Sequence, residues 1–452
     1  MLIKAARSVF GLEGMPNGRG NFSPSNVGRI LPEGNSRGSG GKLVRVEIHR
    51  GLPSNSRDPV DYRRMVAIGR QHQILTHCPT RRSGRDLHRA RPHLWHRWSQ
   101  QWDVTLTAYR HRQGLRTIDD TARVELTAAS LLRYLEQRGV VPAGAACTVE
   151  PLGGGISNDV WRVESAGDCL VVKQALPFLR VAEVWAYDVG RSSIEHRCLT
   201  EINRLLGPDY APEVVFSDDT QHMFGMTCAP AGGLSWKDQL LAGQIDLRDA
   251  YRAGDLLGRI HAASAADGAA AVSFADQQTL IEGRVDPYHR TVAARHEDLA
   301  LLIDREIERM LATRRALVLG DYAPKNLIAY PDSMLVLDLE VAHWGDPAFD
   351  VAFCLNHLSL KALHMPRQRA LLAALARAFH AAYCEHAGQL ADEAAVVCEL
   401  GILMVARVDG KSPAEYLDQR SQLLARAIGR SLLLDPPNTV MQAIERVEVA
   451  AP

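Results

Sequence analysis

An acid and an amide stand five positions apart in the stretch VLGDYAPKNLI, residues 318–328. The apolar run before Gly320 is typical of a buried strand, and the loop after it carries Asp321, Lys325 and Asn326. A carboxylate can take the proton of an attacking hydroxyl, and carboxylate and amide oxygens are hard donors of the kind that Mg²⁺ prefers. The loop therefore predicts an acid–base group close to a cation site.

A second acidic pair follows on the next predicted strand, SMLVLDLE, residues 333–340. This strand ends with Asp338 and Glu340, which we expect to reach the same cleft as the loop. Phosphoryl transfer has matching needs, namely a carboxylate that orients and deprotonates a hydroxyl and oxygen ligands for the magnesium that neutralises the phosphates. The loop cation Lys325 can stabilise charge on the transferred group.

A glycine-rich turn lies earlier in the chain, in CTVEPLGGGISNDVWRVES. Gly154 and Gly155, followed by Ser157 and Asn158, stand between two predicted strands, and we predict that they bind a nucleotide. Glycine lets backbone N–H groups wrap an anion such as a polyphosphate, which a Cβ atom would obstruct. Hairpins use glycine for geometry at least as often, so the turn alone does not decide between the two uses.

Lys173 ends the next apolar strand, CLVVKQAL. It is either an exposed strand-end residue or a buried cation that needs an acidic partner and a phosphate. The following helix, in VGRSSIEHRCLTEINRLLG, offers Glu195 and Glu201. We predict Glu195 as the partner of Lys173, with Glu201 in reserve.

Two further strands, in EVVFSDDTQHMFGMTCAP, lead into a connection rich in glycine and proline. Such a connection suits a hinge whose backbone hydrogen-bonds an adenine base. We place Met226 and Cys228 at this adenine site.

The composition is that of a globular protein of 452 residues with a formal net charge of zero. This length exceeds one average domain, and the neutral balance gives no indication of a nucleic-acid partner. The eight cysteines lack the paired short spacing of a zinc or redox site, so we expect them to be reduced, as in a cytoplasmic protein. No apolar run reaches the roughly 18 residues of a membrane span, and we expect no membrane partner.

Residues 1–120 form a basic extension with 21 Lys and Arg against 9 Asp and Glu. Its Gly, Ser, Asn and Pro content leaves too little apolar surface to offset the entropy of ordering, so we expect disorder. The later stretch TRRSGRDLHRARPHLWHRWSQQW interleaves basic residues with three tryptophans, a combination that can bind RNA or single strands. A floppy basic tail, or a start site placed too far upstream, are the simpler alternatives.

Ordered structure is expected from ELTAASLLRYLEQRGVV onward, where Thr127 is a plausible N-cap and Gly139 is placed to end a helix. The first half of the remainder reads as a small sheet with one helix, and the second half is mainly helical. We predict an N-terminal lobe over 121–230, a helical lobe over 231–435 and a tail over 436–452.

Three motifs occur in close succession: GDYAPKN at 320–326, LDLE at 337–340 and WGDPAFDVAF at 344–353. In type and order they resemble the aminoglycoside phosphotransferase and choline kinase family, distant relatives of protein kinases. GGGISNDVWRV and VVKQALPFLR resemble the nucleotide-binding lobe of that family, particularly that of methylthioribose kinases. The resemblance covers residues 125–430. It implies an α+β, two-lobed protein-kinase-like fold with a small antiparallel-sheet lobe and a larger helical lobe.

The resemblance also implies a role for each residue of the loop region. Asp321 would accept the proton of the substrate hydroxyl, while Asn326 and Asp338 would bind Mg²⁺. Glu340 occupies the second acidic place of the family's motif, where it would support the site or hold a second metal.

In the nucleotide-binding lobe, the resemblance implies that Lys173 contacts the α- and β-phosphates of ATP and pairs with Glu195. In the helical lobe, it implies that Asp350 holds the catalytic loop through backbone N–H groups.

Two departures from the family limit what can be transferred. The family usually has a histidine before Gly-Asp that supports the loop, whereas this chain has Leu319. The GDYAPKN and LDLE segments resemble the general family more than methylthioribose kinases, so that substrate does not carry over.

The sequence therefore predicts an ATP- and Mg²⁺-dependent phosphotransferase that acts on a hydroxyl of a sugar, metabolite or antibiotic. The alternatives are a catalytically silent kinase fold, motivated by Leu319, and a nucleic-acid-binding module that uses residues 1–120. The segments GRVDPYHRTVAARH, 283–296, and ARVDGKSPAEYL, 406–417, either line the acceptor pocket or form solvated surface. If they line it, their Arg and Lys content favours a hydroxylated or anionic acceptor over a polycationic aminoglycoside.

Overall fold

The structure is a computed structural model that describes residues 124–153, 155–165, 167–181 and 185–450, and three short strands before them. The chain divides into two compact units, Met1–Ala108 and Tyr109–Pro452. In the first unit, an antiparallel sheet is formed by β1 (Val44–Arg45), β2 (Met65–Ala67) and β3 (Ile74–Thr76). These strands lie within the extension predicted to be disordered. The basic, tryptophan-bearing stretch and its predicted nucleic-acid binding lie outside the described residues.

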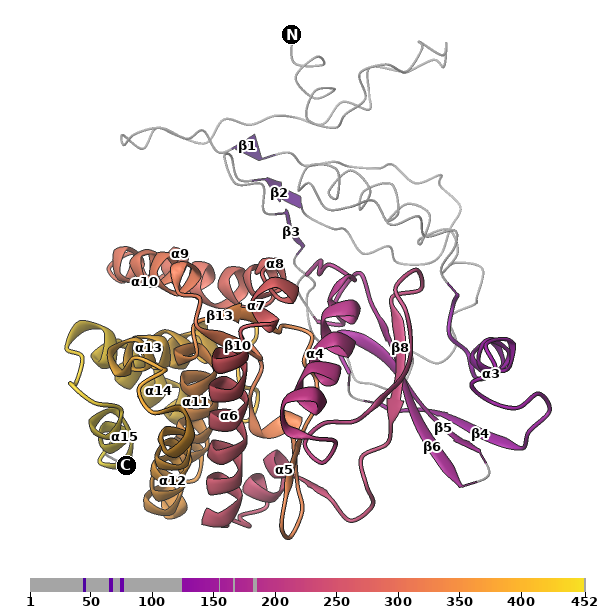
Figure 1. The fold of residues 1–452 in the computed structure, drawn as a ribbon. Coiled ribbons are helices and arrows are strands. Elements are labelled where there is room, and N and C mark those ends of the chain that lie inside the picture. The colour runs from indigo at the N-terminus through magenta and orange to yellow at the C-terminus, as the bar shows by residue number, and fades with distance from the viewer. Residues whose placement is uncertain are drawn as a thin grey trace, which may run out of the picture. The chain divides into compact units, whose positions relative to one another are not determined.

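The second unit begins with an N-terminal lobe built on one antiparallel sheet. Its strands are β4 (Cys147–Pro151), β5 (Asn158–Ser165), β6 (Asp168–Ala175), β7 (Val214–Asp218) and β8 (Met223–Thr227). They are arranged in the order β4-β5-β6-β8-β7. Helix α3 (Ala128–Gln137) begins at the predicted N-cap Thr127, and helix α4 (Arg191–Leu206) lies beside the sheet (Figure 1).

The two faces of this sheet pack against different helices, because successive side chains of a strand point to opposite sides. On β6, Leu170 and Val172 join the apolar cluster around α3. Val171 packs instead against the larger cluster that includes residues of α4. The same alternation places Lys173 on the α4 side, where its predicted partner lies.

The C-terminal lobe is mainly helical, as predicted (Figure 1). Its helices are α5 (Trp236–Leu241), α6 (Leu247–Asp267), α7 (Ala270–Ser273), α8 (Gln278–Leu280), α9 (Thr291–Arg295), α10 (Ala300–Ala312), α11 (Ala348–His364), α12 (Arg369–Ala387), α13 (Glu393–Asp409), α14 (Gln419–Leu434) and α15 (Val440–Glu448). A π-helical segment, η4 (Ile281–Arg290), and two 3₁₀ turns, η5 (Pro324–Asn326) and η6 (Pro366–Gln368), complete the helical part. None of the helices in the described part of the chain is long and apolar enough to cross a membrane.

Short strands of this lobe position the chemistry-bearing loop. Strand β10 (Ala316–Val318) pairs with β13 (His343–Gly345). A second small sheet has the order β12-β11-β9, from β12 (Met334–Val336), β11 (Leu327–Ala329) and β9 (Leu234–Ser235). The predicted α+β fold, with a small antiparallel-sheet lobe and a larger helical lobe, is confirmed.

The predicted tail over 436–452 contains helix α15, so the description of that segment as a tail is wrong. Val440, Ala443, Ile444 and Val447 are buried on one side of the helix. Their spacing of three and four residues is the pattern of an amphipathic helix, and it was present in the sequence.

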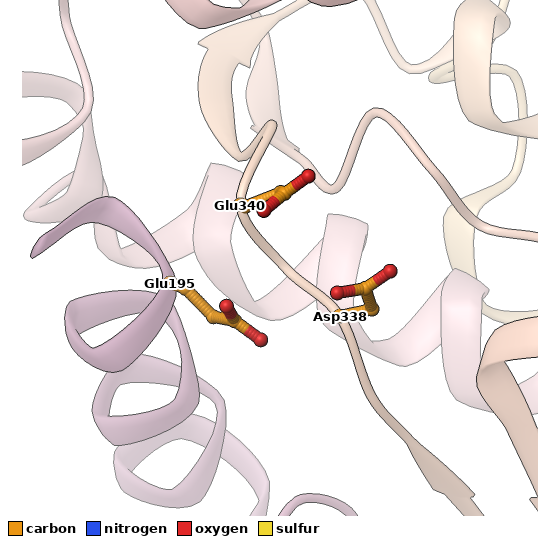
Figure 2. Close-up of side chains that lie close together, drawn as sticks. All are labelled: Glu195, Asp338 and Glu340. Atoms are coloured by element: carbon orange, nitrogen blue, oxygen red, sulfur yellow. The ribbon is translucent and has the colours of Figure 1, made fainter. Parts of the chain in front are cut away.

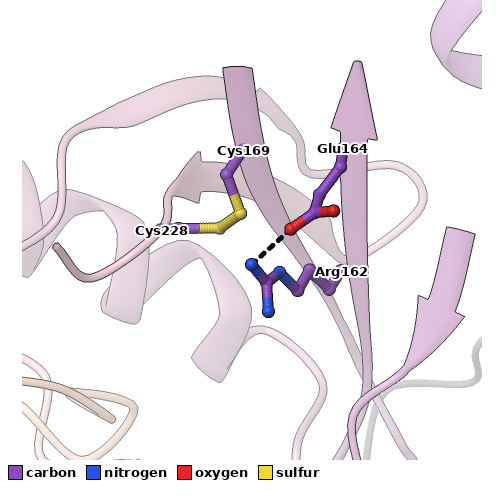
Figure 3. Close-up of a disulfide and its surroundings, with 4 residues drawn as sticks. All are labelled: Arg162, Glu164, Cys169 and Cys228. Carbon is purple, nitrogen blue, oxygen red and sulfur yellow. Dashed lines mark ion pairs between the residues drawn. A yellow bond between two sulfur atoms is a disulfide. The ribbon is translucent and has the colours of Figure 1, made fainter. Parts of the chain in front are cut away.

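The prediction that all cysteines are reduced is also wrong, because Cys169 and Cys228 form a disulfide (Figure 3). The two residues are 59 positions apart in the sequence, and their Cα atoms are 5.4 Å apart. Pairing of β6 with β8 places Leu170 opposite Thr227 and so brings the two cysteines together. This proximity depends on strand register, which cysteine spacing does not reveal.

We expect reduction of this disulfide to lower the melting temperature by about 4 to 10 °C, because closing a loop of this length contributes on the order of 2–4 kcal/mol. Thermal unfolding with and without dithiothreitol measures the shift. Cys147→Ser, which removes a cysteine that is free in the structure, should keep the response. Cys228→Ser should abolish it, and an unchanged wild-type melting temperature would contradict the bond.

Candidate active site

The predicted loop leaves β10 through Gly320, whose φ of +73° is a conformation that favours glycine. A Cβ atom at this position would lie 2.6 Å from Cγ1 of Val341. The N–H groups of Leu319 and Gly320 donate to the Asp350 carboxylate at 2.6 and 2.8 Å. The predicted holding of the loop by Asp350 is therefore confirmed, and it uses the backbone rather than the side chain at position 319.

Asp321 is buried and lies between two cations. Its Oδ1 atom is 2.9 Å from Nη2 of Arg284, and its Oδ2 atom is 2.8 Å from Nζ of Lys325. Asn326 donates through Nδ2 to both the carbonyl and the Oδ2 atom of Asp321, at 3.0 Å each. The structure thus brings together Asp321, Lys325 and Asn326 as predicted, and it adds Arg284.

Arg284 belongs to η4, within the segment 283–296 that the sequence left open between acceptor pocket and solvated surface. Its side chain is buried, and its Nε atom donates to the Gly320 carbonyl at 2.8 Å. Solvated surface is therefore the wrong description for this residue. π-Helical turns are rare and frequent at functional sites, but the sequence carried no signal for one here.

Lys173 pairs with Glu195 at 2.5 Å and with Asp338 at 2.8 Å. The predicted Lys173–Glu195 pair is confirmed, and the reserve candidate Glu201 binds Arg204 instead. Burial would lower the pKa of Lys173, but the charges of Asp338 and Glu195 outweigh it and raise this pKa above its usual range. Lys173 therefore joins α4 to the segment that follows β12 through two ion pairs.

Three carboxylates gather beside this lysine. Figure 2 shows Glu195 on α4 facing Asp338 and Glu340, and the three offer ligand atoms within 4.8 Å of one another. Asp338 has a φ of +64°, which is uncommon for a residue other than glycine. Burial would raise the pKa of Asp338, but Lys173 and Lys325 outweigh it and hold the pKa well below its usual range.

These donors fit a hard divalent cation, because they are oxygens and at least one carboxylate is held ionised. Asn326 uses its Nδ2 atom toward Asp321, which leaves Oδ1 for a metal. Lys173 engages one oxygen of both Glu195 and Asp338, so Asn326, Asp338 and Glu340 remain the predicted ligands, and Glu195, whose Oε2 atom is unbonded, joins them as a candidate.

Glu340 has a further contact that the sequence did not indicate. Its Oε2 atom accepts from Nδ2 of Asn158 at 2.9 Å and from Nε of Arg191 at 3.2 Å. The Arg191 guanidinium is fully buried, and its remaining N–H groups donate to the carbonyls of Ser157, Leu176, Tyr187 and Asp188. Arg191 thereby ties the glycine-rich turn and α4 to the C-terminal lobe.

Arg191 occupies the first residue of α4, where the helix dipole disfavours a cation. An arginine at that position was the one indication in the sequence that buried hydrogen-bond acceptors lie nearby. Asn158, predicted as a nucleotide ligand, donates through its Nδ2 atom to Glu340 and to Oγ of Ser157.

The remaining predicted nucleotide contacts are only partly located by the structure. Gly154 lies outside the described residues, whereas Gly155 is exposed at the turn before β5. Met226 is buried within β8, opposite Val171 of β6. The Cys228 N–H donates to the Cys169 carbonyl at 3.2 Å, so it is already engaged and is not free for a base.

A family model described as the phosphotransferase enzyme family (APH) matches residues 148–391. Methylthioribose kinase 2 of Oryza sativa subsp. japonica is 27% identical over 286 residues, which cover 56% of this chain and 65% of the rice protein. Methylthioribose kinase of Bacillus mycoides (strain KBAB4) is 23% identical over 274 residues, which cover 54% of this chain and 68% of the relative. The match thus spans less than two thirds of the rice protein.

Two solved structures show weaker likeness. A choline/ethanolamine kinase family protein from Mesorhizobium loti has a TM-score of 0.40 and 17% identity, with 71% of this chain and 99% of that chain covered. Choline kinase from Streptococcus pneumoniae has a TM-score of 0.39 and 12% identity, with 67% and 98% covered.

The matched residues 148–391 make up more than half of the chain and contain Lys173, the loop of Asp321 and the segment of Asp338. The chain therefore belongs to the phosphotransferase enzyme family.

Proposed function

We propose that the chain is an ATP- and Mg²⁺-dependent small-molecule kinase, which transfers the γ-phosphate of ATP to a hydroxyl of a sugar, metabolite or antibiotic. The observation that carries this proposal is the bond between Lys173 and Asp338. It brings the lysine of the N-terminal lobe next to the acid that follows β12. The phosphate-binding and metal-binding parts of a phosphoryl-transfer site are therefore adjacent. Family membership supports the same reaction class.

In this proposal Asp321 is the general base. It orients the acceptor hydroxyl and takes its proton, while Arg284 and Lys325 keep positive charge beside the reacting oxygens. Asn326, Asp338 and Glu340 hold Mg²⁺, which when bound neutralises charge on the phosphates.

The nucleotide is bound by the sheet lobe. Lys173 contacts the phosphates, and the glycine-rich turn from Gly154 to Asn158 closes over them through backbone N–H groups. Met226 and Cys228 flank the adenine, although the Cys228 N–H is engaged elsewhere. We place the reaction in the cytoplasm, where ATP is available, although the Cys169–Cys228 disulfide departs from the reduced cysteines usual there.

The substitution of Leu319 for the family's histidine does not by itself argue for a silent site. Leu319 is buried, and its N–H is held by Asp350 at 2.6 Å. The loop is therefore fixed without a side-chain contribution from this position.

We expect Mg²⁺-ATP to raise the melting temperature of the wild type, and Asp338→Asn to abolish that shift. A ligand at about 100 times its Kd stabilises by about 2.7 kcal/mol, and the variant removes the charge that Lys173 and the metal both contact. Thermal unfolding with Mg²⁺-ATP, with ATP plus EDTA, and without nucleotide measures it. Asp332→Asn, at an exposed turn, should keep the full shift. A folded wild type without any shift would contradict the proposal.

A further inference from the structure

Helix α11 carries an unusual row of side chains that leads away from the loop of Asp321. Phe353, His357 and Lys361 are spaced four residues apart and so lie on one side of the helix. The Arg284 guanidinium lies 5.3 Å from the centroid of the Phe353 ring, and the rings of Phe353 and His357 are 5.1 Å apart. The row therefore begins beside the partner of Asp321 and ends at Lys361.

Lys361 is 1% exposed and has no acidic partner within ion-pairing distance among the residues that the structure describes. Its hydrogen bond is a long one, from Nζ to the His357 carbonyl at 3.4 Å. Burial, with smaller contributions from Lys237 and Arg407, lowers the pKa of Lys361 to about 7, while Cys354 acts in the opposite direction. A buried ammonium without a counter-charge is costly, so a lysine is rarely kept there unless it binds something.

Two other polar groups near Lys361 also lack partners. Arg407, in the last turn of α13, donates through Nη1 to Ser412, but its Nε atom is buried and unbonded. The Tyr416 hydroxyl is likewise buried and unbonded, although Nζ of Lys361 lies 5.6 Å from the centroid of the Tyr416 ring. Neither Lys361 nor Arg407 forms an ion pair within the described part of the chain, so neither has a carboxylate as a counter-charge there.

His357 lies on the same side of α11 as Lys361, four residues before it. Burial lowers its pKa, and so do the charges of Lys361, Arg407, Lys325 and Arg284. The cations therefore extend from the surroundings of Asp321 along α11. Asp321 itself already pairs with Arg284 and Lys325.

We propose that Lys361, Arg407 and the Tyr416 hydroxyl bind an oxyanion of the phosphate acceptor, so that the acceptor is a small hydroxylated acid carrying a carboxylate or phosphate. One oxyanion would supply the counter-charge of both cations and accept from the Lys361 ammonium, the Arg407 Nε–H group and the Tyr416 hydroxyl. A cationic acceptor such as choline or an aminoglycoside would be repelled by the same groups. This assignment rests on the proposed kinase function, because it places the anionic end of the molecule whose hydroxyl meets Asp321.

Thermal unfolding of the full chain in the presence of Mg²⁺-ADP tests the site with two probes, inorganic phosphate and malonate, against chloride at equal ionic strength. We expect at least one probe to raise the melting temperature of the wild type. The shift should be lost in Lys361→Met and Arg407→Gln and kept in Arg420→Gln, a charge removal at an exposed position of α14. The probe that acts tells whether the acceptor carries a phosphate or a carboxylate.

Folding of the variants is part of the readout. Without a probe, Lys361→Met should melt at or above the wild-type temperature, since it replaces a buried unpaired cation by an apolar chain of similar length. A probe shift that persists in both Lys361→Met and Arg407→Gln would overturn the proposal, and so would the absence of any probe shift in the wild type.

Failure of the kinase function would appear differently. Suppose that a probe raises the melting temperature through Lys361 but Mg²⁺-ATP does not stabilise the protein. That result would support the anion site and contradict the kinase function. For an acceptor found by screening, Lys361→Met should raise KM at least about 10-fold and leave the KM for ATP unchanged, as expected for loss of a charged hydrogen bond. An unchanged acceptor KM would overturn the assignment of substrate class.

Discussion

Asp321→Asn is expected to lower kcat by about 10³-fold or more while leaving the Kd for Mg²⁺-ATP within about twofold. The substitution keeps the size of the side chain and its hydrogen bond with Asn326, but it removes the group that accepts the hydroxyl proton. General base catalysis contributes typically 10²–10⁴-fold, and misplacement of the hydroxyl adds to this loss. Nucleotide binding depends on Lys173 and the acids beside it, which the change does not touch.

The measurement is ADP release at saturating Mg²⁺-ATP, with an acceptor from screening or with water as a slow acceptor. Asp332→Asn provides a matched removal of charge at an exposed site and should retain wild-type turnover. If Asp321→Asn kept turnover within about tenfold of the wild type, Asp321 would be a positioning residue and another base would be required. If the wild type bound Mg²⁺-ATP but never released ADP, the silent-fold alternative would replace the kinase.

The parts of this site that the sequence predicted are those encoded by short segments. The loop from Gly320 to Asn326 folds back on itself, and Asn326 contacts Asp321 because the two are only five positions apart. The pairing of Lys173 with Glu195 was also within reach, since α4 is the next helix after β6 and offers only two acids, Glu195 and Glu201. In both cases the partners are close in sequence or on adjacent elements.

The parts that the sequence did not predict depend on contacts between distant elements. Arg284 reaches Asp321 across 37 residues from a π-helical turn, whose irregular spacing no helical pattern anticipates. The Cys169–Cys228 bond requires the register of β6 on β8. Lys361 interrupts a helix that is buried on nearly all sides, and only the surrounding packing shows that its charge lacks a partner.

The largest expected effect on stability belongs to Arg191→Met, which we expect to lower the free energy of unfolding by about 3–5 kcal/mol. Methionine fills much of the same volume but donates no hydrogen bond. The carbonyls of Ser157, Leu176, Tyr187 and Asp188 would lose their guanidinium donors, and Glu340 would lose its cation. Arg191→Lys should recover only part of the loss, because a single ammonium cannot reach acceptors arranged around a planar fork.

Chemical denaturation of the wild type, Arg191→Met and Arg197→Met measures this difference. Arg197 lies on the same helix, but its side chain is exposed, so its replacement should cost less than about 1 kcal/mol. A similarly small cost for Arg191→Met would contradict a structural role for its hydrogen bonds.

The double variant Arg191→Met/Glu340→Gln separates the ion pair from the carbonyl contacts. If the 3.2 Å contact between Nε of Arg191 and Oε2 of Glu340 stabilises the fold, the losses of unfolding free energy in the two single variants should add up to more than the loss in the double variant. The reason is that the second change removes a carboxylate that the first has left without its cation.

The same variants also test how the two lobes share the nucleotide site. Glu340 is proposed to hold Mg²⁺ and is anchored to the glycine-rich turn through Arg191 and Asn158, so Arg191→Met should weaken Mg²⁺-ATP binding even under conditions where the protein remains folded.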